Sequence, residues 1–319
     1  MEHLEKVKTR SVDLFKKVTE KYGYAKPVAA IVGGLWLFNK LLVRFGFFMK
    51  KQLKGEVVFI TGAASGIGKQ MAFMFALQGA KVAIVDLNLS GAEEVANLIN
   101  ERQGQALAVY CDVSSYDSVH EAAQTVRERF GVPTILINNA GIVSGLKFLQ
   151  GDLGRMEKTI QVNLTSHLYT LKELLPDMIR NDHGHVVTIA SMAGFIGVSG
   201  MVDYSASKFG AVGLNESLRV ELKLMHSKVK TTCVCPYYIN TGMFHGISLA
   251  HQWAFPLLDE GYVARRIIQA IRQETEVLIL PFTGMLASVL KAAVPAWFSD
   301  WVLNFLGLST AMETFKGRA

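Results

Sequence analysis

The chain has 319 residues, half of them hydrophobic, and a formal net charge of +6. Its mean hydropathy of +0.26 is high for a soluble protein and indicates contact with a membrane. A basic balance suits nucleic acid or an anionic membrane surface. The basic residues form no long run and no nucleic-acid motif is present, so we expect no nucleic-acid partner. Cys111, Cys233 and Cys235 are too few for a disulfide framework, fit a reducing compartment and lack the neighbouring ligands that a metal site needs.

The N-terminal region contains two segments. Residues 1–27 carry apolar side chains at helical spacing with lysines between them, which predicts an amphipathic segment. Residues 28–50 form a predicted membrane anchor, because a helix over 28–48 would be about 31 Å long and a hydrocarbon core is about 30 Å thick. Lys40 and Arg44 interrupt the apolar run, so a spanning anchor, a re-entrant or interfacial anchor and a soluble core helix all remain open. We expect no cleavable signal peptide, since the run starts late and lacks a small-residue cleavage site.

Short apolar, β-branched runs alternate with helical stretches throughout residues 51–281. The runs begin near residues 56, 80, 106, 133, 184, 229 and 276. This alternation predicts an α/β fold of Rossmann type, a doubly wound parallel sheet with helices on both faces.

A glycine-rich turn follows the first of these runs. Gly62, Gly66 and Gly68 would let the backbone approach a pyrophosphate at a helix N-terminus, although a plain tight turn also explains them. Asp86 ends the second run, where a carboxylate accepts hydrogen bonds from a ribose 2′-hydroxyl and repels a 2′-phosphate, which favours NAD over NADP. A helix-capping or turn aspartate is the alternative for Asp86, and Asp112 after the third run is less specific.

Tyr204 and Lys208 lie four residues apart in a stretch with the pattern of a helix start. They would therefore share one helix face. Tyrosine normally titrates near pH 10, and a nearby positive charge favours its phenolate. The pair indicates either a tuned proton-transfer group or two neighbours on a solvated helix.

These motifs together resemble the short-chain dehydrogenase/reductase family over residues 55 to about 280. The matching pieces are T-G-x-x-x-G-I-G at 61–68, N-N-A-G at 138–141, a serine at 191 and Y-x-x-x-K at 204–208. The resemblance implies that Tyr204 is the general acid/base, and that Lys208 lowers the tyrosine pKa and holds the nicotinamide ribose. It also implies that Ser191 binds the substrate oxygen and that Asn163 supports a water-linked proton path.

The resemblance further implies a nicotinamide cofactor; Asp86 favours NAD over NADP, and the sparse ligand residues lead us to expect no metal. The resemblance places one set of residues beside that cofactor: Gly62, Ser65, Gly66, Ile67, Gly68, Asp86, Asp112, Val113, Asn139, Ala140, Gly141, Tyr204, Lys208, Pro236 and Thr241. The family commonly has glycine after the proline that ends the sixth strand. Tyr237 stands there in this chain, which leaves the local backbone open.

The C-terminal residues 282–319 are apolar and aromatic, and prolines divide them into short predicted helices. With the N-terminal anchor, they resemble a membrane-associated branch of the family that acts on retinol, 17β-hydroxysteroids and other lipid alcohols. These helices would serve as a substrate lid or membrane contact, or would complete the fold or a dimer interface. An apolar substrate cleft is expected, with core packing as the alternative for each member, from Met192, Phe195, Ile196, Val198, Tyr237, Tyr238, Met243 and Phe244.

The resemblance thus implies NAD-dependent oxidation of an apolar lipid alcohol, such as retinol or a 17β-hydroxysteroid, to its carbonyl. An NADPH-dependent lipid carbonyl reductase and a lipid-droplet or membrane interaction protein on a dehydrogenase scaffold are the alternatives. The resemblance also implies a homodimer through helices near 152–180 and 203–227. It implies attachment to the endoplasmic reticulum or lipid droplets, with the catalytic domain facing the cytosol.

Overall fold

The structure, a computed structural model, describes residues 33–34, 51–248, 255–305, 307 and 310–317. The chain divides into two units, Met1–Lys50 and Lys51–Ala319, and the fold described here is that of the second. The predicted amphipathic segment and the predicted anchor lie outside the described residues, apart from 33–34. Within the described part of the chain, no helix combines the length and the apolar character needed to cross a bilayer.

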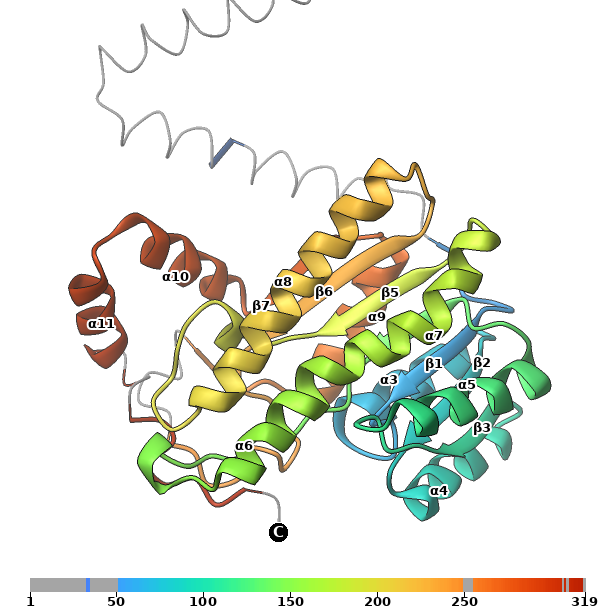
Figure 1. Ribbon diagram of the computed structural model, residues 1–319, viewed down its shortest axis with the longest axis horizontal. Coiled ribbons are helices and arrows are strands. Elements are labelled where there is room, and N and C mark those ends of the chain that lie inside the picture. The colour runs from blue at the N-terminus through green and yellow to red at the C-terminus, as the bar shows by residue number, and fades with distance from the viewer. Residues whose placement is uncertain (1–32, 35–50, 249–254, 306, 308–309, 318–319) are drawn as a thin grey trace, which may run out of the picture. The chain divides into compact units, whose positions relative to one another are not determined.

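Among the described residues, seven strands form one parallel sheet in the order β3-β2-β1-β4-β5-β6-β7 (Figure 1). The order reverses at β1, which pairs with both β2 and β4, so the crevice beyond the carboxyl ends of β1 and β4 is where such sheets bind ligands. Each strand lies where the sequence predicts one: β1 Val57–Thr61, β2 Lys81–Asp86, β3 Gln105–Tyr110, β4 Ile135–Asn138, β5 His185–Ile189, β6 Lys230–Pro236 and β7 Val277–Leu280.

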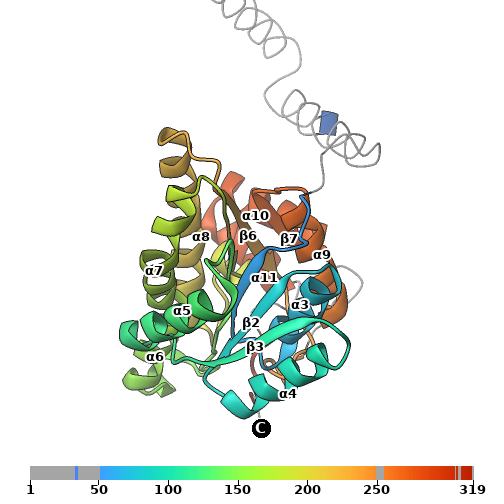
Figure 2. The same ribbon diagram turned by 90° about the vertical axis from the view of Figure 1, so that its right-hand side faces the viewer.

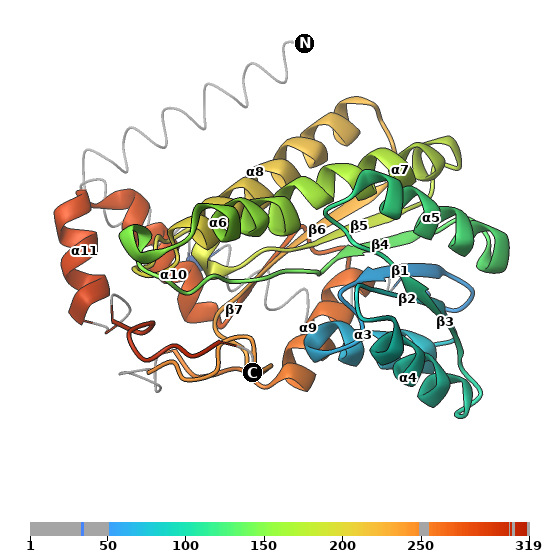
Figure 3. The same ribbon diagram turned by 60° about the horizontal axis from the view of Figure 1, so that its bottom comes forward.

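Helices cover both faces of the sheet (Figures 2 and 3). One face carries α3 Gly66–Leu77, α4 Leu89–Asn100 and α9 Glu260–Arg272, and the other carries α5 Tyr116–Phe130, α7 Ser166–Arg180 and α8 Val202–Leu224. A further helix, α6 Leu153–Ile160, leads into α7 through the π-helical turn η2 Gln161–Thr165. The described residues also include the short 3-10 turns η1 Phe148–Gln150 and η3 Met192–Gly194. The predicted doubly wound α/β fold is confirmed.

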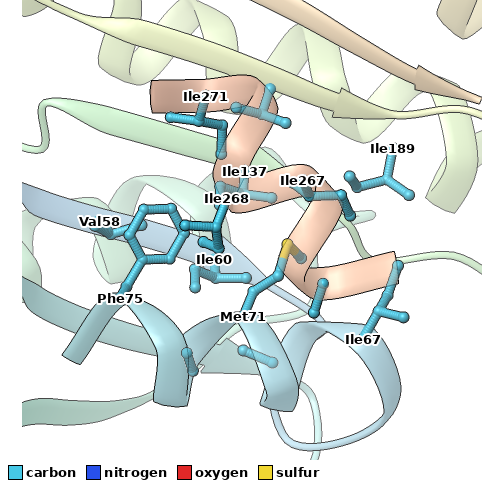
Figure 4. Close-up of a cluster of buried hydrophobic side chains, with 14 of the residues drawn as sticks. Val58, Ile60, Ile67, Met71, Phe75, Ile137, Ile189, Ile267, Ile268 and Ile271 are labelled. Atoms are coloured by element: carbon cyan, nitrogen blue, oxygen red, sulfur yellow. The ribbon is translucent and has the colours of Figure 1, made fainter. Parts of the chain in front are cut away.

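Successive side chains of β1 point to opposite helical layers, as a strand requires. Val58 and Ile60 pack in the cluster that contains Met71 and Phe75 of α3 and the isoleucines of α9 (Figure 4). Phe59 packs in the separate cluster beneath α5 and α7. Each such burial contributes about 1.5–3 kcal/mol. The strand that leads into the glycine-rich turn is therefore held from both sides.

The described residues of the C-terminal part include the short helices α10 Phe282–Ala293 and α11 Ala296–Phe305. Each follows a proline directly, Pro281 for α10 and Pro295 for α11, and this confirms the predicted division. Both helices lie at the end of the sheet formed by β6 and β7 (Figure 3). The surface of α11 exposes three aromatic side chains, Trp297, Trp301 and Phe305.

Candidate active site

A cavity of about 640 Å³ opens where β1, β4, β5 and β6 end. Ser191 and every residue predicted to lie beside the cofactor line it. Asn163 is the predicted site residue that does not line it. The fold therefore brings together residues from turns that are far apart in the sequence.

Glycines shape the turn between β1 and α3. Gly62 has a φ of +64°, and a Cβ at this position would lie 2.8 Å from the Ala140 Cα. Gly66 has a φ of +55°, and a Cβ on Gly68 would overlap the Gly62 carbonyl. The first turn of α3 reads Gly-Ile-Gly-Lys, so no carboxylate competes for its positive end. This bare backbone at a helix N-terminus fits the pyrophosphate of a dinucleotide.

Asp86 closes β2 at the cavity, as predicted. Its Oδ2 accepts a hydrogen bond of 2.9 Å from the Ala64 backbone N–H, and its Oδ1 accepts one of 2.9 Å from the Asn88 N–H. These bonds orient the carboxylate beside the glycine-rich turn, and each oxygen keeps a second lone pair for a ribose hydroxyl.

Asp112 contacts a lysine that the sequence did not single out. Its Oδ1 accepts hydrogen bonds from the Ser114 N–H and Oγ, at 2.9 and 2.6 Å. Lys158 Nζ lies 3.6 Å from the other carboxylate oxygen. Burial alone would raise the pKa of Asp112, but these bonds and the lysine charge outweigh it and lower the pKa. Lys158 also lines the cavity, and no motif marks it, because only the fold brings α6 beside the end of β3.

Ser191, Tyr204 and Lys208 meet in the cavity. The Ser191 Oγ accepts a hydrogen bond of 3.1 Å from the Ala193 N–H and donates one of 3.4 Å to the Pro236 carbonyl, and it lies close enough to the Tyr204 hydroxyl to lower the tyrosine pKa. Lys208 Nζ donates to the Ile189 carbonyl at 2.8 Å and lies 5.6 Å from the centre of the Tyr204 ring. The tyrosine hydroxyl and the serine hydroxyl are therefore arranged to bind one substrate oxygen.

Burial dominates the electrostatics of this group. It raises the pKa of Tyr204 to about 12, and the hydrogen bond with Ser191 opposes the shift only in part. Burial also lowers the pKa of Lys208 to about 8. The expectation that Lys208 lowers the tyrosine pKa stays a prediction. Burial has the larger effect on Tyr204 in this structure, because the amine is turned to the Ile189 carbonyl while the phenol lies among apolar side chains.

Asn163 lies in the π-helical turn and is fully buried. Its Oδ1 accepts a hydrogen bond of 2.8 Å from the Ile142 N–H. Its Nδ2 donates to the Ile142 carbonyl at 2.9 Å and to the Ser207 Oγ at 3.1 Å. The side chain thus joins the loop after β4 to α8 beside Lys208. The proton path through Asn163 stays a prediction.

The apolar side chains predicted for the substrate cleft line the cavity, with the exception of Phe195. Phe195 packs instead with Ala190 and Ala211, because η3 directs Met192 and Ile196 into the cavity and turns Phe195 toward α8. The sequence did not single out Met201 and Phe255, which also line the cavity but come from distant segments without a motif.

Tyr237 occupies the position where the family commonly has glycine. Its φ lies outside the positive region, so a side chain is tolerated. The ring packs against Tyr238 and Phe255, with ring centres 4.8 and 5.4 Å apart. The substitution therefore adds an aromatic side chain to the cavity wall.

A dinucleotide-dependent hydride transfer needs an anion cradle and a proton-transfer group that face one space. This cavity contains both, so the molecule is an oxidoreductase of the doubly wound, dinucleotide-binding class. The family model described as short chain dehydrogenase matches residues 56–252. The chain belongs to the short-chain dehydrogenase family.

Two relatives and one solved structure illustrate this membership. The chain is 41% identical over 271 residues to Short-chain dehydrogenase/reductase family 16C member 6 of Bos taurus, covering 84% of this chain and 86% of that one. It is 41% identical over 268 residues to Epidermal retinol dehydrogenase 2 of Homo sapiens, covering 83% and 87%. The fold is similar to that of a short chain dehydrogenase/reductase from Burkholderia phymatum in complex with NAD, with a TM-score of 0.70, 23% identity, and 76% and 95% of the chains covered.

Proposed function

We propose that this protein oxidises an apolar alcohol, of the retinoid or 17β-hydroxysteroid type, to its carbonyl with NAD. One observation carries the proposal: Ser191 and Tyr204 line the same cavity as a group of apolar and aromatic side chains that includes Met192, Tyr238 and Phe244. A pocket of this kind binds apolar molecules and orients them by a few polar groups. The similarity to an epidermal retinol dehydrogenase supports the retinoid class.

The chain's own residues supply binding and proton transfer. Bound NAD would supply the acceptor for the hydride that leaves the alcohol carbon. The ionised Tyr204 oxygen takes the proton of the alcohol as the hydride leaves, which returns Tyr204 to its hydroxyl form, and Ser191 Oγ holds the same substrate oxygen. Because burial raises the pKa of Tyr204, its phenolate is a strong base that is scarce at neutral pH. Lys208, with a pKa of about 8, is mostly protonated at pH 7 and offers a positive charge nearby.

The choice of NAD rests on Asp86. Its carboxylate lies beside the glycine-rich turn, where it would accept hydrogen bonds from a ribose 2′-hydroxyl and repel a 2′-phosphate. A high cellular ratio of NAD to NADH would then favour oxidation.

Membrane attachment and dimerisation belong to the same proposal. The predicted anchor would hold the catalytic unit at the endoplasmic reticulum or a lipid droplet, facing the cytosol. Trp297 and Trp301 on α11 are 72% and 60% exposed, and tryptophan is favoured at membrane interfaces. Exposed Phe209 and Leu224 on α8 support a homodimer through α7 and α8.

NADH fluorescence from membranes that contain the protein tests the activity, with all-trans-retinol, estradiol and a long-chain alcohol offered in parallel. We expect a signal with one substrate class that is lost in Tyr204→Phe. Tyr262→Phe is the matched control, because that ring lies on the exposed surface of α9. Full activity in Tyr204→Phe would refute the proton-transfer role. Activity only with NADPH and a carbonyl substrate would favour the reductase alternative.

A further inference from the structure

The end of the chain packs against three loops around the catalytic cavity. We propose that residues 310–317, here called the C-terminal strap, hold the loop after β6 (residues 237–248) in place and so set how large an apolar alcohol the cavity accepts. The inference rests on the proposed function for its substrate class. In this proposal the strap does not touch the substrate; it affects substrate selection by supporting the residues of the cavity wall.

Backbone hydrogen bonds join the strap to the loop after β6. The Ser248 N–H donates to the Ala311 carbonyl at 3.1 Å, and the Lys316 N–H donates to the His245 carbonyl at 2.9 Å. Figure 3 shows the strap in red beside this loop in orange. Because the two bonds lie at both ends of the segment from His245 to Ser248, the strap restrains that segment as a unit.

Three glycines with positive φ make room for the strap. Gly145, in the loop after β4, has a φ of +68°, and a Cβ there would overlap the Phe315 ring. Gly200, just before α8, has a φ of +76°, and its Cβ would lie 3.2 Å from the Met312 Cβ. Gly246 has a φ of +87°, and its Cβ would lie 2.7 Å from a strap carbonyl oxygen. Each of the three loops therefore presents bare backbone where the strap passes.

The strap reaches the cavity through one apolar cluster. Ala311 and Met312 are buried in this cluster together with Met201, Tyr204 and Tyr238. The partly buried side chains packed against it include Val198, Phe244 and Phe315. Among the described residues that line the cavity, none belongs to the strap, whereas Met201, Tyr238 and Phe244 all do line it. Met312 and Phe315 are therefore positioning residues that support the cavity wall from behind.

The consequence is a selective effect on substrate size. A cavity wall that the strap supports makes van der Waals contacts with a bulky alcohol along the whole length of the substrate. A loosened wall loses those contacts. A short alcohol that reaches only Ser191 and Tyr204 makes few of them. Weakening the strap should therefore raise KM for a bulky alcohol and leave the cofactor affinity unchanged.

The test compares Phe315→Ala and Met312→Ala with Glu313→Ala, whose exposed side chain lies on the same strap. We expect KM for all-trans-retinol to rise by about tenfold in the first two variants, with KM for a short alcohol unchanged. Phe315→Leu should keep KM for all-trans-retinol close to the wild-type value, because it keeps an apolar side chain against the loop. An equal rise in KM for both alcohols, or the same effect in Glu313→Ala, would overturn the inference.

Two readouts do not need turnover. Hydrogen exchange at the Ser248 amide should accelerate in Phe315→Ala and not in Glu313→Ala. Retinol affinity, measured by retinol fluorescence in the presence of NAD, should fall only in the strap variants. If the wild-type protein binds retinol without oxidising it, the proposed function fails and the loss of affinity in Phe315→Ala still supports the strap. If exchange and affinity are both unchanged in Phe315→Ala, the strap inference fails whatever the activity.

Discussion

Replacing Lys208 by methionine should stabilise the fold at neutral pH, although it removes an amine that the proposed mechanism uses. The side chain is 3% exposed, and burial lowers its pKa from 10.5 to about 8. At about 1.4 kcal/mol per pH unit, keeping this amine charged inside the fold costs about 3 kcal/mol. Methionine fills a similar volume without charge and loses only the hydrogen bond to the Ile189 carbonyl, worth about 1 kcal/mol. The free energy of unfolding should therefore rise by about 2 kcal/mol at pH 7.

The stability difference between Lys208→Met and the wild type should depend on pH, and the direction of that dependence tests the reasoning. Between pH 8 and 10.5 the unfolded chain keeps a proton that the folded Lys208 has released, so the stability of the wild type rises with pH relative to the variant. The advantage of Lys208→Met is complete below about pH 8, falls by about 1.4 kcal/mol per pH unit above it, and disappears at about pH 9.5. Urea unfolding of the full chain, followed by circular dichroism from pH 7 to 9.5, measures this difference. The exposed Lys172→Met is the control and should change stability by less than about 0.5 kcal/mol. A Lys208→Met difference that does not vary with pH would refute the reasoning.

Three further perturbations test the cofactor site, the Asn163 junction and the core. Asp86→Ser removes the charge that would repel a 2′-phosphate and should improve NADP binding relative to NAD by about tenfold; an unchanged ratio of the two dissociation constants contradicts this. Asn163→Ala leaves the Ile142 N–H and carbonyl without their side-chain partner and should lower the free energy of unfolding by about 2–4 kcal/mol, which thermal unfolding would detect. Met71→Ala should cost about 2–5 kcal/mol, whereas Met225→Ala, at a 57% exposed position, should cost less than about 0.5 kcal/mol; similar urea midpoints would be inconsistent with the packing shown in Figure 4.

The sequence predicted those features that depend on neighbouring residues. A strand such as β1 is a buried apolar run that ends at Gly62, and the spacing of Tyr204 and Lys208 places both on one turn of α8. Strand–helix alternation then permits few topologies, since parallel connections cross over with one hand. These local patterns predicted the doubly wound parallel sheet, and its strand order was then found in the structure.

Features that depend on tertiary packing were predicted less well. Phe195 was expected in the cleft because it is apolar and follows Ser191, but the 3-10 turn η3 directs it away from the cavity. Lys158 reaches Asp112 only because α6 packs beside the end of β3, and no residue near either one signals the contact. Periodicity specifies the face of a helix or strand, and it does not specify the direction of a side chain in an irregular turn.

The raised pKa of Tyr204 connects the strap to the chemistry. The sequence spacing places the positive charge of Lys208 one helical turn from the Tyr204 phenol. The apolar cluster around that phenol, which includes Met312 and Phe244, nevertheless has the larger effect on the Tyr204 pKa. Water admitted by a loosened strap would solvate the phenolate and move the pKa of Tyr204 from about 12 toward its ordinary value near 10. The rising limb of the kcat/KM profile for alcohol oxidation, which the ionisation of the base Tyr204 sets, should therefore shift to lower pH in Met312→Ala and stay in place in Glu313→Ala. An unshifted limb in Met312→Ala would mean that the strap supports the cavity wall without reaching the proton-transfer group. A shifted limb would mean that substrate fit and base strength depend on the same packing.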